Sequence, residues 1–343
     1  MHVFNYNFLR NASVDADILN RATNLERIRG GMVPLSDRLS RTLERRAVLM
    51  SVIDSNDIEG IRTSEERMIK IINNVTAPRG QDEEEIAGYR DALRYIHSKH
   101  GSIVLDKKEI LNIYGMLMMH TNAEPAFKTR DNVIIERDIE GNVVMVHPTV
   151  PSEQTERCID QMLYSFWEAR NDADINKLLL IPCFIMDFLR IHPFIDGNGR
   201  MSRLLTILLL YQEGYEVCRY TSIESKINAS KSDYYTALEE SEIGWFENEC
   251  DYGPFIKHFL DCLFLCYREL NLTAGTTMGR NGTGDSIEVF MRSCYIHVSK
   301  KDICMMFPEV SETTVERVLK KMCDSGEIIK VGESRATRYI AKR

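Results

Sequence analysis

The sequence predicts a mainly α-helical protein with one β-hairpin and a small C-terminal domain. Three observations carry this prediction. Apolar residues recur at three- and four-residue steps in most segments between residues 34 and 270. Within that part, runs of β-branched residues stand out only at 132–136 and 142–146. A stretch rich in Thr, Gly and Asn, 272–286, then separates this body from the end of the chain.

The composition is that of an ordinary soluble protein. Of the 343 residues, 44% are hydrophobic and 27% are charged, enough for a large core and a second, smaller domain. The apolar stretches are interrupted before they reach membrane-spanning length, and residues 1–13 lack a signal-peptide pattern. Nine scattered cysteines without a Cys-x-x-Cys pair indicate reduced thiols. We therefore expect a cytoplasmic protein without a membrane partner.

The net charge of −8 is unevenly distributed. From Ser286 to the last residue the chain has 11 basic and 8 acidic side chains, so this part is mildly basic and the remainder acidic. The asymmetry indicates that the C-terminal part has a different partner from the body.

Helical periodicity predicts a series of helices in the body. No function is assigned to residues 1–20, whose periodicity is weak. His120 and His147 are expected to be structural, because neither belongs to a cluster with ligand spacing. The predicted helices are 34–59, 63–73, 81–98, 107–120, 152–171, 177–190, 204–211, 231–238 and 254–270.

The first of these helices ends at Ser55–Gly60, where Gly60 suits a C-terminal cap. Ser55 and Glu59 are four residues apart, so they share one face of the helix. On this segment alone, a helix end with a solvated glutamate is the favoured interpretation.

The predicted hairpin has two open interpretations. Its strands, 132–136 and 142–146, are joined by a loop with a glycine at position 141. An isolated hairpin is marginal unless it packs on something. It is either a decoration on the helical body or a flap whose free edge pairs with an extended peptide.

Beyond the linker, three short helices (287–298, 301–306 and 313–325) and two strands (328–331 and 338–341) are predicted. Ser299 and Ser311 suit the N-caps of the second and third helices. This order resembles a winged helix-turn-helix domain. The resemblance implies that 313–325 is a recognition helix. The residues available for phosphates would be Lys320, Lys321, Arg335 and Arg338. Since winged helices also bind proteins, either DNA or a protein remains an open partner.

The stretch 191–203 lies between the two most apolar predicted helices and reads Ile-His-Pro-Phe-Ile-Asp-Gly-Asn-Gly-Arg-Met-Ser-Arg. Its Gly197-Asn198-Gly199 segment offers backbone N–H groups just before a helix, where the helix dipole favours anions. Arg200 and Arg203 are three residues apart and share one side of that helix, and arginine suits phosphate oxygens.

A metal ligand and a base accompany this anion site. Asp196 supplies the hard oxygen that Mg²⁺ on a polyphosphate requires. His192 has an unperturbed pKa of about 6.5, so it can accept a proton from an attacking hydroxyl. The sequence contains no Gly-x-x-x-x-Gly-Lys-[Ser/Thr], which excludes a Walker-type NTPase. These residues favour nucleotide chemistry over a polar helix cap.

This stretch resembles the signature of the Fic family, His-x-Phe-x-[Asp/Glu]-Gly-Asn-Gly-Arg-x-x-Arg, and every fixed position is filled. The resemblance covers roughly residues 35–265. It implies a Fic helical bundle with a β-hairpin flap. It also implies transfer of AMP from ATP to a hydroxyl of a target, which is another protein or this chain itself.

The resemblance implies a role for each residue of the motif. His192 would be the catalytic base toward a target Ser, Thr or Tyr, and Phe194 would anchor the loop in the core. Asp196 would bind Mg²⁺ between the α- and β-phosphates of ATP.

The remaining motif residues would bind phosphates. Gly197, Asn198 and Gly199 would form the anion hole. Arg200 would lie on the β-phosphate side and Arg203 on the γ-phosphate.

Outside the motif, the resemblance implies further contacts. Val133 and Ile134 would lie in the flap that pairs with the target backbone. Tyr234 and Tyr235 would lie near the adenine. A family asparagine after this pair corresponds to Glu242 here, so the chain departs from the family at a nucleobase contact.

The resemblance also changes the interpretation of Ser55–Gly60. Family members with an N-terminal inhibitory helix carry [Ser/Thr]-x-x-x-Glu-[Gly/Asn], filled here by Ser55, Glu59 and Gly60. Glu59 would pair with Arg203 and remove a γ-phosphate partner, which would turn ATP away from in-line attack.

We therefore predict an autoinhibited protein adenylyltransferase and four regions. These are an N-terminal helical region with the inhibitory helix (1–100), a Fic core (101–270), a linker (271–286) and a winged-helix-like domain (287–343). Two alternatives stay open. Glu59 orients a water so that the protein removes AMP from targets, or the chain is a DNA-binding regulator with a nucleotide-sensing Fic body. Self-association also stays open.

Overall fold

The computed structural model describes residues 2–10, 14–32, 34–137, 143–277, 284–292, 294, 296–333 and 337–342. It confirms a mainly helical fold with two small sheets, each of two antiparallel strands, in these ranges. The elements are η1 (Asn7–Leu9), α1 (Ala16–Gly30), α2 (Asp37–Ile58), α3 (Glu65–Ile72), α4 (Gln81–Lys99), α5 (Lys107–Met118), β1 (Val133–Arg137), β2 (Val143–Pro148), α6 (Ser152–Asn171), α7 (Lys177–Ile191), α8 (Asn198–Gln212), η2 (Glu216–Arg219), α9 (Ile223–Ala229), α10 (Lys231–Glu242), η3 (Trp245–Glu247), α11 (Gly253–Thr277), α12 (Asp285–Arg292), α13 (Lys300–Met306), α14 (Glu312–Asp324), β3 (Ile328–Val331) and β4 (Arg338–Ala341).

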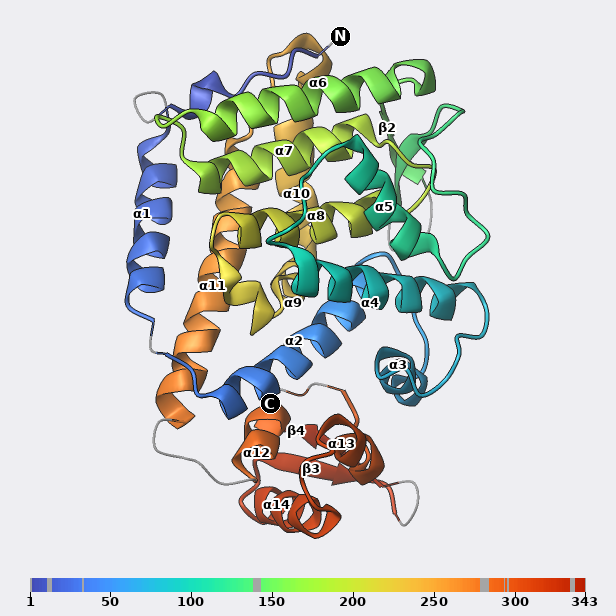
Figure 1. Ribbon diagram of the computed structural model, residues 1–343, viewed down its shortest axis with the longest axis vertical. Coiled ribbons are helices and arrows are strands. Elements are labelled where there is room, and N and C mark those ends of the chain that lie inside the picture. The colour runs from blue at the N-terminus through green and yellow to red at the C-terminus, as the bar shows by residue number, and fades with distance from the viewer. Residues whose placement is uncertain are drawn as a thin grey trace.

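The centre of the body is the pair α7 and α8. Nearly every side chain of these two helices is buried, which explains why both are apolar around most of their circumference. Figure 1 shows α6 and α7 side by side and α2 crossing below α8, with α11 along one flank. The turn between α7 and α8, which holds the motif, is therefore fixed on both sides by buried helices.

The N-terminal segment, which has no clear periodicity, is held by one buried carboxylate. Asp187 on α7 is 0% exposed and accepts hydrogen bonds from Tyr6 Oη at 2.7 Å, Trp245 Nε1 at 2.8 Å and Tyr252 Oη at 2.6 Å. Its burial raises its pKa despite these donors. The segment is ordered by long-range polar contacts that no local pattern reports.

Three predicted helix boundaries differ most from the structure. α8 begins at Asn198, so most of the expected loop is its first turn. α11 continues to Thr277, so 271–277 is helix and not linker. α12 ends at Arg292, and Val298 instead forms a β-bridge with Tyr339. The helices α1 and α9 were not predicted, whereas β3 and β4 have the expected bounds.

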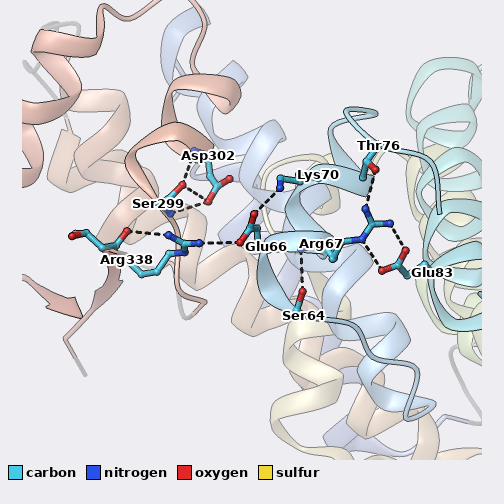
Figure 2. Close-up of polar contacts among 10 residues, drawn as sticks. Ser64, Glu66, Arg67, Lys70, Thr76, Glu83, Ser299, Asp302 and Arg338 are labelled. Carbon is cyan, nitrogen blue, oxygen red and sulfur yellow. Dashed lines mark hydrogen bonds and ion pairs between the residues drawn. The ribbon is translucent and has the colours of Figure 1, made fainter. Parts of the chain in front are cut away.

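The C-terminal part, 284–342 within the described ranges, packs against the helices that precede the motif. α12 packs on α2, and polar pairs join the last strand and α3. Figure 2 shows Glu66 of α3 between Lys70 and Arg338, with Arg338 Nη2 at 3.0 Å. His297 donates its backbone N–H to Glu65 Oε2 at 2.9 Å. The resemblance of this part to a winged helix stays a prediction.

The hairpin is confirmed as an isolated antiparallel pair, β1 with β2, with a register shift after Glu136. Its predicted loop around Gly141 lies outside the described residues. No helix in the described ranges is both long enough and apolar enough to cross a bilayer.

Candidate active site

His192 caps the end of α7 in a left-handed conformation, with φ at 51°. Its backbone N–H donates to Phe188 O at 3.0 Å, which completes the last turn. A non-glycine residue in this region stores about 1–2 kcal/mol of strain, and such residues cluster at functional sites. The left-handed conformation of His192 reverses the direction of the chain between α7 and α8.

The imidazole of His192 is arranged to act as a base. Nδ1 lies 3.2 Å from Leu189 O. A carbonyl oxygen only accepts, so Nδ1 holds the proton and Nε2 keeps its lone pair. Burial lowers the pKa of His192 to about 4, and the nearby Lys128 adds to this effect. The ring is therefore neutral at pH 7.

Phe194 anchors the loop between the two helices. Its ring is 0% exposed and stacks on Tyr114 with a centroid distance of 3.6 Å. Asn198 holds the same residue from the other side: its Oδ1 accepts from Phe194 N at 3.0 Å and its Nδ2 donates to Phe194 O at 2.8 Å. The buried side chain of Asn198 thus fixes the loop, and only the backbone N–H of this residue is available to an anion.

The predicted anion cradle would lie at the N-terminus of α8. Gly197 is the N-cap residue at φ 78°, a conformation that favours glycine. It has no side chain to cap the first N–H groups of α8, which leaves the positive end of the helix dipole accessible to an anion. Gly199 is needed for clearance, because a Cβ there would lie 2.2 Å from Glu59 Oε1.

Arg203 and the inhibitory motif meet in the structure. Arg203 is 2% exposed, and its Nη2 donates to Glu59 Oε1 at 2.7 Å. Ser55 accepts the remaining bonds, with its Oγ 2.8 Å from Arg203 Nε and its carbonyl 2.9 Å from Nη2. Burial by itself would raise the pKa of Glu59, but Arg203, with smaller contributions from Arg200 and Lys231, makes the net shift downward. The Glu59 carboxylate is therefore ionised and lies against the cradle.

Gly60 ends α2 as predicted. It has φ 76°, and its N–H donates to Asp57 O at 3.0 Å while Ile61 N donates to Asn56 O at 3.0 Å. These two bonds are a Schellman motif. Glu59 is the C-cap residue just before this turn.

Polar contacts also fix the last turns of α2 to the body. Asn228 Nδ2 donates to Asp54 at 2.9 Å and to Asp57 at 3.0 Å. Lys231 Nζ donates to Ile58 O at 2.7 Å. One helical turn earlier, Ser51 donates to the buried Glu224 at 2.7 Å. These anchors place Glu59, and none of them was predicted.

The two tyrosines have different surroundings. Tyr234 is 5% exposed and its hydroxyl interacts with Ser202 and Arg203, so it forms the wall behind Arg203. Tyr235 is 38% exposed and meets Tyr234 edge to face at 5.3 Å. Only Tyr235 presents an accessible ring to a nucleobase.

Glu242 is engaged elsewhere. Its carboxylate pairs with Arg190 at the end of α7 and with His147 on β2. Arg190 also donates to Pro148 O at 3.0 Å. The residue at the family's asparagine position therefore joins the flap to α7.

The flap is attached directly to the catalytic loop. Asn132 Nδ2 donates to Phe194 O at 2.8 Å, and Lys128 Nζ donates to Asn132 Oδ1 at 2.7 Å and to Ile191 O at 3.1 Å. Burial lowers the pKa of Lys128 to about 8. Lys128 and Asn132 were not singled out in the sequence, because a lone lysine and asparagine in a polar stretch carry no signal.

The predicted flap residues lie on β1. Val133 is 48% exposed and Ile134 is half-buried. Among the described residues β1 pairs only with β2, so its other edge offers free backbone groups.

Asp196 fits Mg²⁺ on a polyphosphate. Its side chain is 62% exposed, Oδ1 accepts from Gly197 N at 2.7 Å, and Oδ2 lies 3.5 Å from Arg200 Nη2 on the exposed side, where a cation would share it. Mg²⁺ commonly uses one or two carboxylates with water and substrate phosphates. The described residues hold no group of three His, Cys, Asp or Glu that would form a dedicated metal cage. A single carboxylate is consistent with an ion that arrives with its nucleotide.

Arg200 forms a buried ion pair with Glu85, a partner that was not predicted. Its Nη2 lies 2.6 Å from Glu85 Oε2 on α4, with the two side chains 1% and 6% exposed. Arg200 Nε and Nη1 are buried without a hydrogen-bond partner among the described residues. Glu85 lies in the acidic run 82–85, which by sequence is typical of any helix N-terminus.

A neutral histidine beside a helix N-terminus, between two buried helices, is the arrangement expected of a helical phosphate-binding domain. Residues 104–210 match the model of the Fic/DOC family. The recognition made from the motif is confirmed.

Curated relatives carry a more specific name. Protein adenylyltransferase Fic from Nematostella vectensis is 25% identical over 228 residues, which cover 64% of this chain and 47% of that protein. The protein of the same name from Drosophila virilis is 26% identical over 227 residues, covering 65% and 42%. The chain spans less than half the length of these relatives.

Solved structures share the fold. A Fic family protein from Desulfovibrio desulfuricans G20 has a TM-score of 0.62 at 20% identity and covers 96% of this chain and 97% of its own. A Fic domain containing signaling protein from Bacteroides thetaiotaomicron VPI-5482 has a TM-score of 0.60 at 18% identity, covering 76% and 98%. The first likeness extends into the C-terminal part.

Proposed function

We propose that the chain is an autoinhibited protein adenylyltransferase that moves AMP from ATP to a Ser, Thr or Tyr hydroxyl of a target protein. One observation carries this proposal: a neutral His192 stands beside an anion cradle whose Arg203 is bound by Glu59. The names of the curated relatives support the same activity.

The chemistry follows from the residues of the loop. Nε2 of His192 takes the proton of the target hydroxyl as that oxygen attacks the α-phosphorus of ATP, and the bond to the pyrophosphate leaving group breaks. Backbone N–H groups at 197–199 stabilise the charge that develops on the phosphoryl oxygens. Asp196 would hold Mg²⁺ together with the phosphates, and the ion would neutralise their charge.

Inhibition follows from competition for one guanidinium. Glu59 uses Nη2 of Arg203 and occupies the space above Gly199. A γ-phosphate that needs the same arginine meets a like charge there. ATP then either stays out or binds with its α-phosphate out of line with the attacking hydroxyl.

The flap supports recognition of an extended target segment. Because the free edge of β1 is tied through Asn132 to the catalytic loop, a strand added to this edge lies next to His192. Backbone pairing of this kind selects an extended conformation more than a side-chain sequence.

Mass spectrometry tests the transferred group. The Glu59→Gly variant is incubated with ATP and Mg²⁺, alone and with candidate targets. We expect a mass gain of one AMP on a hydroxyl side chain and none in the Glu59→Gly/His192→Ala double variant. A gain of a different group, or none on any target, would contradict the proposal.

The alternative reaction, removal of AMP from a target, uses the same carboxylate. Glu59 is 32% exposed in its side chain, so a water can reach it. A pre-modified target separates the two reactions, since only removal releases AMP with wild-type protein and stops when Glu59 is replaced.

Binding of DNA by the C-terminal part has less support. Lys321 pairs with Glu288 at 2.6 Å and Arg338 with Glu66 at 3.0 Å. Lys320 is exposed, and Arg335 lies outside the described residues. Two of the four residues available for phosphates are thus already neutralised, and a protein partner or self-association stays equally open.

Replacing Glu85 by glutamine should raise the KM for ATP about 10-fold or more in the activated Glu59→Gly background, with a smaller change in kcat. Arg200 would lose its buried counter-charge and its fixed position on the β-phosphate side. Steady-state kinetics separate KM from kcat, and Glu85→Asp should restore part of the loss.

Glu84→Gln is the matched control, because Glu84 lies on the same turn of α4 and is only half-buried. An equal loss in both variants, or a fall in stability without a change in KM, would assign Glu85 a structural role only.

A further inference from the structure

A second hollow lies behind the inhibitory helix, outside the catalytic loop. It measures about 500 Å³ and is formed where α2, the end of α3, α4 and η2 face the C-terminal part. Its volume is in the range of sites that hold small ligands. Its polar lining is mainly basic, and one carboxylate, Glu44, takes part.

Two arginines that line this hollow have no close ion pair, although Asp91 acts on Arg94 from a longer distance. In the described part of the chain, neither Arg94 nor Arg219 has a carboxylate within 4.0 Å. Arg94 donates to Ile72 O at 2.6 Å and Arg219 to His97 O at 3.4 Å, and carbonyls neutralise no charge. Arg219 Nε is buried without a hydrogen-bond partner. Arg94 is exposed and Arg219 is half-buried, so both guanidinium groups can be reached from solvent, and an anion that enters the hollow would meet two charged donors.

The remaining groups do not supply that anion. Arg45 lines the same hollow but is paired with Glu309 at 2.7 Å. Burial and the Arg219 charge lower the pKa of His97 to about 3, so His97 is neutral. With Glu44 the only carboxylate in the lining, the hollow keeps an excess of positive charge.

We propose that this hollow binds a nucleoside diphosphate, with the phosphates on Arg94 and Arg219. Arginine's planar fork matches phosphate oxygens. The apolar part of the lining suits a flat base, and it comprises Val48, Leu49, Ile72, Met305, Met306 and Pro308. Asn73 and Ser98 add polar groups to the lining. Two arginines beside an apolar surface favour a nucleotide over a simple anion.

The site joins the two parts of the chain. Its wall includes residues of α2, which ends in Glu59, and residues at the end of α13. A ligand that contacts both parts favours their docked arrangement, because it binds that arrangement and not the separated one. The inference does not depend on the reaction at His192.

Isothermal titration with ADP and with GDP tests the proposal at about 150 mM salt, where non-specific attraction is screened. The full-length wild-type chain is compared with Arg94→Gln/Arg219→Gln. We expect the double variant to lose one binding site per chain, or to bind at that site more than about 10-fold more weakly. ADP bound at the catalytic loop remains in both proteins and is counted separately by the stoichiometry.

Two further variants make the result decisive. Arg27→Gln/Arg268→Gln removes the same charge from exposed arginines on α1 and α11 and should bind as wild type. Ser98→Trp fills the hollow from an exposed position and should remove the same site even if the double arginine variant folds poorly. Equal stoichiometry and affinity in wild type, the double arginine variant and Ser98→Trp would overturn the proposal. Failure of wild type to bind either nucleotide at the hollow would do so as well.

Discussion

Replacing Glu59 by glycine should increase AMP incorporation from ATP by roughly 10- to 100-fold. A coupling of about 1–3 kcal/mol between two mutually exclusive partners of one site corresponds to a change of this size. The loss of the carboxylate frees Nη2 of Arg203 and the space above Gly199 together. Incorporation of radiolabelled AMP into a target, at saturating ATP, measures the increase.

Ser55→Ala is the matched control for this release. It removes one acceptor from Arg203 Nε and leaves the Glu59 carboxylate in place, so activity should rise far less. Glycine at position 59 is tolerated by the backbone, which has an ordinary φ of −87°. Equal incorporation by wild type and Glu59→Gly would mean that the ion pair is structural and not inhibitory.

Replacing His192 by alanine in the Glu59→Gly background should lower transfer by about 10²- to 10⁴-fold, the range for loss of a general base. Binding of ATP should persist, because the cradle and both arginines remain. His120→Ala is the control: His120 is a half-buried histidine that pairs with Asp91 at 2.7 Å, outside the motif. Unchanged transfer by His192→Ala would remove the base from the mechanism.

The pH profile gives the same prediction a second measurement. A histidine with a pKa of about 4 is already deprotonated above pH 5.5, so the rate of Glu59→Gly should be flat from about pH 5.5 to 8. It should fall only as the pH approaches 4 and the imidazole gains a proton. Glu59 raises this pKa, so its removal shifts the fall to still lower pH. An inflection near pH 6.5 would contradict the buried position of the ring.

Much of the fold could be predicted because its helices carry their own periodicity. The predicted bounds of α6, 152–171, agree with the structure, since an amphipathic pattern extends from Pro151 to the end of the helix. The predicted end of α11, residue 270, is seven residues too early, because glycine and threonine are typical of linkers, yet the helix continues to Thr277. Intrinsic preference is a weak guide where a helix is extended from a packed body.

The residues of the candidate site likewise divide into those that the sequence predicts and those that it does not. The loop around His192 is a local motif, and its residues could be assigned from their spacing and the family resemblance. Glu85, Lys128 and Asn132 act on that loop from other elements, and each is an ordinary residue in its own segment. Their positions depend on tertiary packing, which sequence periodicity does not report. Glu59 could be paired with Arg203 in advance only because the resemblance supplied the partner.

If Glu59 inhibits the protein as proposed, the Schellman turn at Gly60 has a consequence for how far the protein must move to become active. Because contacts to Asn228 and Lys231 hold α2 up to Ile58, release of Arg203 requires a new rotamer of one side chain rather than displacement of a helix. The energy scale of the transition is then that of a single ion pair. A ligand that prefers the open form by about 2.7 kcal/mol, or one present at 100 times its dissociation constant for that form, changes the ratio of open to closed molecules about 100-fold. The nucleotide concentration of the surroundings can therefore act as the threshold that determines what fraction of molecules is active.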